Sequence, residues 1–145
     1  MTISVEVVSE VSDSLVEDLN LLLPQLSSTS TRLTHGALAE MVQSPSVTMF
    51  VARDDVRVVG TLTLVVFAIP TGRRAWIEDV VVDRSVRGTG VGQMLTSAAI
   101  ERATDLGVRS IDLTSRPSRE AANALYQKLG FHLRETNVYR YSLES

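Results

Sequence analysis

The chain has 145 residues, no cysteine, two histidines and a formal net charge of −3 at pH 7 from 14 basic and 17 acidic side chains. This length suits one domain, 1–145, and the lack of cysteine excludes disulfides and thiolate zinc sites, while two isolated histidines favour an organic cofactor over a metal. The nearly balanced charge offers no overall attraction for nucleic acid or for an anionic membrane.

The N-terminal stretch shows no charged region followed by an apolar run, and no segment approaches the ~20 apolar residues of a membrane span. We therefore expect a cytoplasmic protein without a membrane partner.

Alternating apolar residues over residues 3–8 predict a half-buried first strand. Ser12 or Asp13 can cap the helix that follows. The apolar residues of this helix recur with the helical period and are Leu15, Val16, Leu19, Leu22 and Leu23.

Serine and threonine dominate residues 27–35, which predict a mobile connection into a short helix near residues 38–42. We interpret His35 as an exposed loop residue. Runs of β-branched residues then predict two strands, residues 47–53 and 58–67, joined as an antiparallel hairpin.

The strand pattern breaks at residues 70–74, and an apolar strand follows over residues 75–82. A glycine-rich turn, residues 87–92, then opens an amphipathic helix over residues 93–106. The next strand, residues 110–114, is reached through this helix, so it should run parallel to the strand at 75–82 or splay away from it.

The end of the chain predicts one more helix, residues 119–129, which Gly130 stops in a left-handed conformation. Residues 131–135 and 138–143 are expected to close the domain as a hairpin around Asn137. The element order β-α-α-β-β-β-α-β-α-β-β predicts a mixed α/β fold, α+β-like, of about seven strands and four helices.

The glycine-rich turn RGTGVG lies where a helix begins, and the unpaired N–H groups there attract anions. Glycine can take positive φ, so several N–H groups can converge on one pyrophosphate. A P-loop is excluded because Gln93 and Met94 follow the last glycine. A dinucleotide fold is the closer alternative, with Asp112 ~20 residues further on, but the glycine spacing and the short remainder of the chain do not fit it.

Arg87, Gly90 and Gly92 form the pattern Arg-x-x-Gly-x-Gly after a strand that ends at residues 80–82, and LYQKLGF follows at residues 125–131. These two signatures, in this order, resemble the GNAT superfamily of N-acetyltransferases. The resemblance implies a mixed sheet splayed between its fourth and fifth strands, with acetyl-CoA as co-substrate and no metal.

The resemblance also implies the cofactor contacts. In GNAT proteins the strand backbone at this position pairs with the pantetheine arm, the glycine turn holds the pyrophosphate, and an asparagine at the position of Asn123 hydrogen-bonds the pantetheine chain. The alternative for Asn123 is an exposed helix residue. The predicted cofactor-binding residues are Val80, Val81, Val82, Arg87, Gly88, Thr89, Gly90, Val91, Gly92, Gln93 and Asn123.

Glu78 and Tyr126 are the predicted catalytic residues. Strict alternation puts the even-numbered residues of 76–82 on one strand face. The resemblance implies that the acetyl group lies beside Val80, so Glu78 is expected near it, where it can take a proton from the amine. The alternative is that Glu78 only positions the amine or pairs with an arginine. Asp79 falls on the other face, where a structural role is expected because a buried carboxylate needs a partner. Tyr126 resembles the family tyrosine that protonates the CoA thiolate, and the alternative is a core aromatic.

The sequence thus predicts an acetyl-CoA-dependent N-acetyltransferase that transfers the acetyl group directly to a small-molecule or protein amine in a ternary complex. Similar proteins are frequently homodimers. The alternative is a non-catalytic acyl-CoA-binding sensor, which would need neither Glu78 nor Tyr126. Acceptor specificity is expected to depend on residues 27–42 and 67–74.

Overall fold

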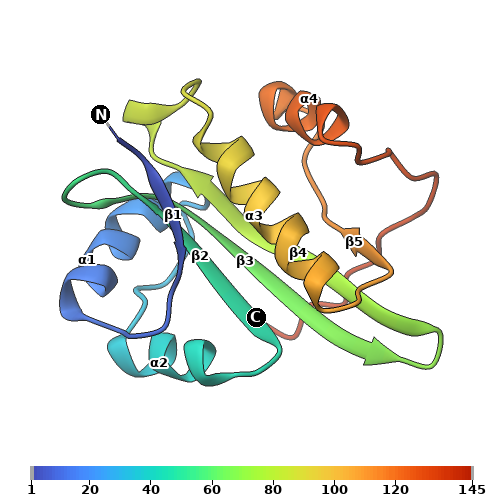
Figure 1. Ribbon diagram of the computed structural model, residues 1–145, viewed down its shortest axis with the longest axis horizontal. Coiled ribbons are helices and arrows are strands. Elements are labelled where there is room, and N and C mark those ends of the chain that lie inside the picture. Colours follow the sequence, from blue (N-terminus) through green and yellow to red (C-terminus); the bar gives the residue numbers. More distant parts are fainter. Residues whose placement is uncertain (1, 145) are drawn as a thin grey trace. The chain divides into compact units, whose positions relative to one another are not determined.

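Five strands form one mixed sheet in the computed structural model, which describes residues 2–144. Neighbours among the first four strands are antiparallel, and the fifth runs parallel to the fourth (Figure 1). The mixed sheet and its parallel crossover strand are therefore confirmed. The strands follow the order β1 (Ser4–Val7), β2 (Val47–Arg53), β3 (Val58–Ile69), β4 (Gly72–Val82) and β5 (Ser110–Asp112).

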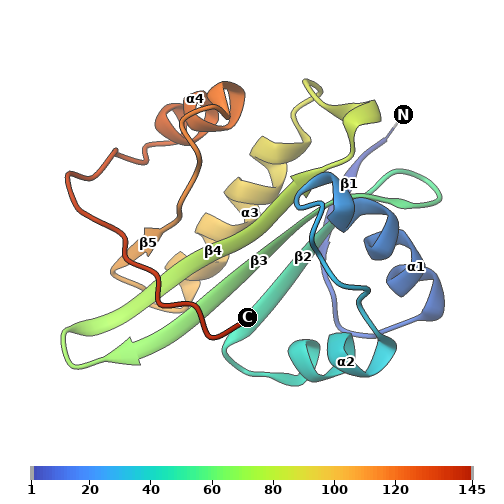
Figure 2. The ribbon, with the colours of Figure 1, turned by 180° about the vertical axis from the view of Figure 1, so that it is seen from behind.

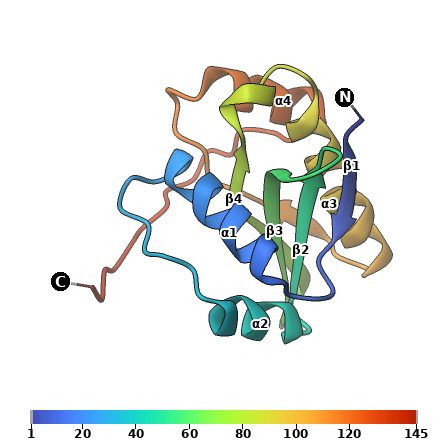
Figure 3. The same ribbon diagram turned by 90° about the vertical axis from the view of Figure 1, so that its left-hand side faces the viewer.

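Helices cover both faces of this sheet (Figure 3). The helices α1 (Asp13–Leu22) and α2 (His35–Gln43) lie on one face, and α3 (Val91–Asp105) lies on the other. On the α1 and α2 side, burial of aliphatic side chains provides the main stabilisation. That core contains Leu15, Val16, Leu19, Leu22, Leu38, Met49, Val51, Val58 and Val81.

Gly60 on β3 lets α3 approach the sheet closely. A Cβ atom at this position would lie 3.1 Å from Leu95 Cδ1 and 3.1 Å from Val91 Cγ1. Because both of these side chains belong to α3, the contact fixes the first turns of that helix against the middle of the sheet.

Side-chain caps set the starts of α1 and α2. The Ser12 hydroxyl accepts a hydrogen bond from the Leu15 N–H at 3.2 Å, which confirms the predicted cap. The Thr34 hydroxyl accepts from the Ala37 N–H at 3.1 Å, so α2 begins three residues before its predicted start. His35 is therefore the first residue of a helix, with its Nδ1 atom 3.2 Å from Asp13 Oδ1, and its interpretation as a loop residue was wrong.

The strands β3 and β4 form a long hairpin. Ile69 pairs with Gly72, so the break predicted over residues 70–74 is only a tight turn, and β4 starts earlier than expected. Gly72 has a φ of +126°, a conformation that residues with a Cβ rarely adopt. Since β2 pairs with β3 only as far as Val65, the end of the hairpin continues past β2 (Figure 2).

The chain divides into two compact units, and the second begins at Ser115. Its helix α4 (Glu120–Lys128) is followed by Gly130, which has a φ of +103° and donates its N–H to the Gln127 carbonyl at 3.1 Å. The predicted final helix and its left-handed stop are thus confirmed.

The hairpin predicted over residues 131–135 and 138–143 was wrong, because residues 131–144 contain no strand. The described chain therefore has five strands and not seven. Alternating apolar residues form a strand only when a neighbouring strand pairs with their backbone and a core covers one face. Neither condition holds here, and the exposed side chains are Leu133, Val138, Tyr139, Tyr141 and Leu143.

Candidate active site

The glycine-rich turn connects β4 to α3. A short 3₁₀ helix, η2 (Arg84–Val86), precedes it, and the turn itself contains Gly88 with a φ of +80° and Gly90 with a φ of +94°. A Cβ atom at either glycine would meet no heavy atom within 4 Å, so the outer side of the turn is open. The positive φ values confirm why this segment needs glycine.

The helix α3 begins at Val91 with no side-chain cap on its first turn. The first N–H groups of a helix have no partner within it, and the helix dipole adds a partial positive charge there. The turn and the helix start therefore form an exposed group of backbone donors suited to an anion.

Side chains within the turn hold it in shape. Arg87 donates from Nε to the Val82 carbonyl at 3.1 Å, and the Thr89 hydroxyl donates to the Val86 carbonyl at 2.5 Å. Val86 and Val91 are both buried and anchor the two ends of the turn. Arg87 and Thr89 thus orient the backbone of the predicted anion site.

A β-bulge interrupts β4 at Asp79 and Val80. Thr63 of β3 pairs with Glu78 and Thr61 pairs with Val81, so two residues of β4 oppose one residue of β3. Asp79 has a φ of +50° and is the one non-glycine residue with positive φ among residues 2–144. The bulge changes the direction of β4 just before residues 80–82 and the glycine turn.

The bulge overturns the strict alternation predicted for residues 76–82. Paired residues of an antiparallel ladder share a face, so Glu78 and Val81 both point to the α1 and α2 side. Val82 pairs with Gly60 and lies on the α3 side instead. Val81 is buried in the core, which leaves its backbone but not its side chain available to a ligand.

The two carboxylates next to the bulge are both exposed. Glu78 accepts a hydrogen bond from Trp76 Nε1 at 2.5 Å, which restricts the side chain of Glu78. The predicted structural role of Asp79, buried with a partner, was wrong. The bulge turns Asp79 out of the sheet, and its exposed side chain lines a cavity. The bulge was not predicted from the sequence, since no glycine or proline marks it.

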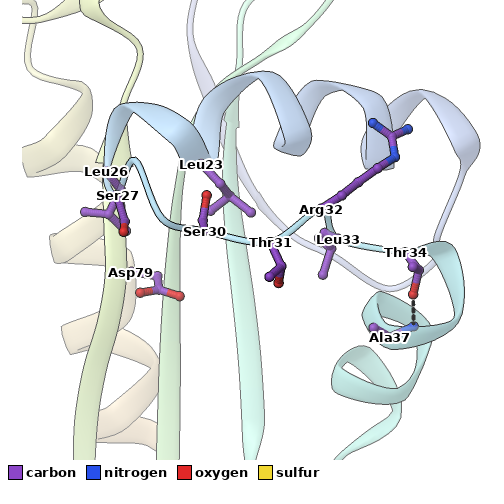
Figure 4. A pocket seen from close by; sticks show the side chains of 10 residues that line it. All are labelled: Leu23, Leu26, Ser27, Ser30, Thr31, Arg32, Leu33, Thr34, Ala37 and Asp79. Atoms are coloured by element: carbon purple, nitrogen blue, oxygen red, sulfur yellow. Dashed lines mark hydrogen bonds between the residues drawn. The ribbon is translucent and has the colours of Figure 1, made fainter. Parts of the chain in front are cut away.

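A cavity of about 540 Å³ lies between Asp79 and the connection from α1 to α2 (Figure 4). In Figure 4, Asp79 lies below Leu26 and Ser27, whereas Arg32 points away from Asp79. Hydroxyl groups and leucines make up most of the wall. The lining residues are Leu23, Leu26, Ser27, Ser30, Thr31, Arg32, Leu33, Thr34, Ala37 and Asp79.

Asn20 fixes the far end of this wall. Its side-chain amide donates to the Leu33 carbonyl at 2.8 Å and accepts from the Leu33 N–H at 2.8 Å. The connection predicted to be mobile is therefore tied to α1 at Leu33.

The strands β4 and β5 separate soon after they meet. Their parallel pairing covers only three residue pairs and ends at Trp76 and Asp112. In the part of the chain that the structure describes, residues 77–82 of β4 thus have β3 as their only strand neighbour. The predicted splay between the fourth and fifth strands is confirmed, and it leaves one backbone edge of β4 open beside the glycine turn.

The second unit contains the two remaining predicted site residues. Asn123 is half-buried, and its Nδ2 donates to the carbonyls of Arg116 and Arg119 at 2.9 and 2.8 Å, so it fixes the turn before α4. Tyr126 stacks edge-on against Phe131, with ring centroids 5.7 Å apart. Burial raises the pKa of Tyr126 above its ordinary value of 10.0, against a smaller opposite effect of Arg119.

The structure brings Glu78, the Val80 to Val82 backbone and the glycine turn together in the first unit, whereas Asn123 and Tyr126 belong to the second. Across residues 2–144, no group of three or more histidine, cysteine or acidic residues could hold a metal ion. No helix in the same range is long and apolar enough to cross a membrane.

An open turn of backbone N–H donors thus lies beside the splayed edge of a mixed α/β sheet. The chain belongs to the acetyltransferase (GNAT) family, whose model matches residues 14–131. The resemblance found in the sequence is thereby confirmed.

Individual relatives agree with this family. The chain is 36% identical to L-2,4-diaminobutyric acid acetyltransferase of Marinococcus halophilus over 63% of this chain and 52% of that protein. It is 33% identical to N-alpha-acetyltransferase 30 of Schizosaccharomyces pombe over 50% of this chain and 48% of that protein. The chain thus spans about half the length of these two relatives.

Among solved structures, a putative acetyltransferase from Agrobacterium tumefaciens str. C58 superposes with a TM-score of 0.84. The two are 26% identical, and the match covers 96% of this chain and 99% of that chain.

Proposed function

We propose that this protein is an acetyl-CoA-dependent N-acetyltransferase that moves the acetyl group directly to a primary amine in a ternary complex. The observation that carries the proposal is the open glycine turn, with Gly88 and Gly90 at positive φ, next to the unpaired edge of β4. Family membership and the names of the relatives support it.

The turn fits the diphosphate of CoA. Residues 87–90 are exposed and lead into the uncapped start of α3, and a Cβ atom at Gly88 or Gly90 would meet no protein atom within 4 Å. The backbone of residues 80–82 can orient an extended ligand along the open edge of β4. When bound, acetyl-CoA would supply the acetyl group as an activated thioester.

The cavity beside Asp79 is where we place the acceptor amine. Amines are mostly protonated at neutral pH, and only the neutral form attacks a carbonyl carbon. An exposed carboxylate such as Glu78 can accept that proton or hold the ammonium in position, and both roles remain proposals. Asp79 places a negative charge on the cavity wall, where it can attract a cationic acceptor, and Arg32, which also lines the cavity, points away from Asp79 (Figure 4).

Tyr126 is proposed as the proton donor to the departing thiolate. A phenol whose pKa is raised by burial stays protonated throughout the physiological range and can donate. Both hydrogen bonds from Asn123 to the carbonyls of Arg116 and Arg119 use its amide nitrogen, so its Oδ1 atom is suited to accept one from a ligand.

The acceptor class is a small-molecule amine or a protein amine. One of the relatives is named for a small diamino acid and the other for α-amines. A cavity lined by four hydroxyl side chains, the Asp79 carboxylate and Arg32 suits a polar acceptor of either kind.

Thiol release from acetyl-CoA, measured with a broad amine panel, tests the proposal. We expect turnover with at least one amine, and a loss of turnover in Glu78→Gln and in Tyr126→Phe. If the wild-type protein binds acetyl-CoA but consumes it with no amine, it is a non-catalytic acyl-CoA sensor and the proposal fails.

A further inference from the structure

Gln25 joins the acceptor side of the site to the glycine turn. It is the last residue of a 3₁₀ helix, η1 (Leu23–Gln25), and directly precedes Leu26 and Ser27 of the cavity wall. Its Nε2 donates to Asp83 Oδ1 at 2.7 Å, and its Oε1 accepts from the Arg84 N–H at 3.0 Å. Because both ends of the amide are used, the side chain of Gln25 has a defined position.

Asp83 is fixed from several other directions. Its N–H donates to the Val59 carbonyl at 2.7 Å, and its Oδ2 accepts from the N–H and the hydroxyl of Ser85. Arg57 Nη2 lies 3.5 Å from the same oxygen. With 13% of its side chain exposed, Asp83 is largely shielded and connects β3, η1 and the segment that leads to Gly88.

The charge of Asp83 is stabilised by these contacts. Hydrogen bonds from the Ser85 and Gln25 side chains, with a smaller contribution from Arg57, hold the pKa of this carboxyl well below its ordinary value. The carboxylate is therefore ionised, and its hydrogen bonds are charge-assisted and strong.

The cavity wall is thus held between two anchors. Gln25 holds its near end to the start of η2, and Asn20 holds its far end at Leu33. Residues 27–32, between these anchors, are exposed. A shift of η2 therefore reaches the wall first at Leu26 and Ser27, and Leu33 is held separately by Asn20.

We propose that Gln25 and Asp83 are positioning residues that relay occupancy of the glycine turn to residues 26–31 of the acceptor cavity. The inference rests on the proposed function, since it takes the turn as the CoA site and the cavity as the acceptor site. A ligand on the turn changes the position of η2 and Asp83, and the two hydrogen bonds of Gln25 pass this change to Leu26 and Ser27. By linkage, an acceptor in the cavity strengthens CoA binding to the same degree.

Amide NMR of the full chain with free CoA tests the relay without any knowledge of the acceptor. In the wild type, we expect the amides of Gly88 and Gly90 and those of residues 26–31 to shift together along one saturation curve. In Gln25→Leu, we expect the turn amides to shift as before and the shifts of residues 26–31 to be lost. Gln43→Leu makes the same chemical change at the exposed end of α2 and should keep both sets of shifts.

A second variant guards against a folding defect. Gln25→Glu keeps the length of the side chain but places a carboxylate against Asp83, so it should also abolish the shifts of residues 26–31. If these shifts persist in both Gln25 variants, or are missing in the wild type while the turn amides move, the relay is refuted. If the turn amides of the wild type do not move, the proposed CoA site itself is wrong.

Discussion

Gly88→Ala, compared with Gly107→Ala, separates the ligand-binding role of the glycine turn from its role in folding. The two glycines are closely matched: Gly88 has a φ of +80° and Gly107 a φ of +72°, and a Cβ atom on either meets nothing within 4 Å. They differ in position, since Gly88 lies in the proposed anion site and Gly107 follows the C-terminal end of α3.

The backbone cost should be equal in the two variants. A residue with a Cβ loses about 1–2 kcal/mol in the left-handed region, so each variant should lower the free energy of unfolding by that amount. Only Gly88→Ala puts a methyl group where the CoA diphosphate would lie. A hydrogen bond to a charged group contributes about 1.5–3 kcal/mol, so loss of one such bond should weaken CoA binding roughly 10- to 100-fold.

Urea unfolding and calorimetric titration with CoA measure the two quantities separately. We expect similar losses of stability in both variants, and a loss of CoA affinity in Gly88→Ala alone. Equal CoA affinity in the two variants, whether retained or lost, would refute the assignment of the turn as the phosphate site.

Three further predictions concern side chains of the site. If Glu78 is the base, Glu78→Gln should lower kcat/KM by about 10²- to 10⁴-fold relative to the wild type. A pH–rate profile should then show this loss becoming smaller at the higher pH where the acceptor amine is already neutral in solution. A loss that is the same at every pH would assign Glu78 to positioning of the amine. Tyr126→Phe should lower kcat while leaving the Kd for CoA unchanged, and pre-steady-state thiol release would show whether the slowed step is departure of the thiolate. For Asp83, the lowered pKa in the folded state means that the carboxylate stabilises the protein above the ordinary pKa of 3.8 and that this contribution is lost as the pH falls below it. Urea titrations should therefore show the largest difference in unfolding free energy between wild type and Asp83→Asn near neutral pH and a smaller one below pH 3.8. A difference that stays constant with pH would contradict the charged role of Asp83.

Local signals predicted much of the fold. The Ser12 cap, the Gly130 stop and the positive φ of Gly88 and Gly90 each follow from the preferences of a single residue type and its neighbours. The glycine turn and the helix behind it were also predicted, but α3 begins at Val91, two residues before its predicted start, so Gly92 lies within the helix.

Features that depend on distant partners could not be predicted in this way. The bulge at Asp79 arises from the pairing of β4 with β3, and it reverses the faces that strict alternation assigns beyond it. Gln25 and Asp83 are 58 residues apart, and no local pattern links them, although the Ser85 that follows Asp83 is typical of a short turn. The alternating residues after Phe131 resemble a strand but have no partner strand.

The most direct test of the central claim is a rapid-quench experiment with acetyl-CoA that carries a radiolabelled acetyl group. The wild-type protein is mixed with this acetyl-CoA and a panel of amines, the reaction is quenched at short times, and the label is located. The account predicts label on an amine with equimolar release of free thiol, only when both ligands are present and without any labelled protein along the way. Label that reaches the protein before the amine, or acetyl-CoA that binds and is never consumed, would contradict it.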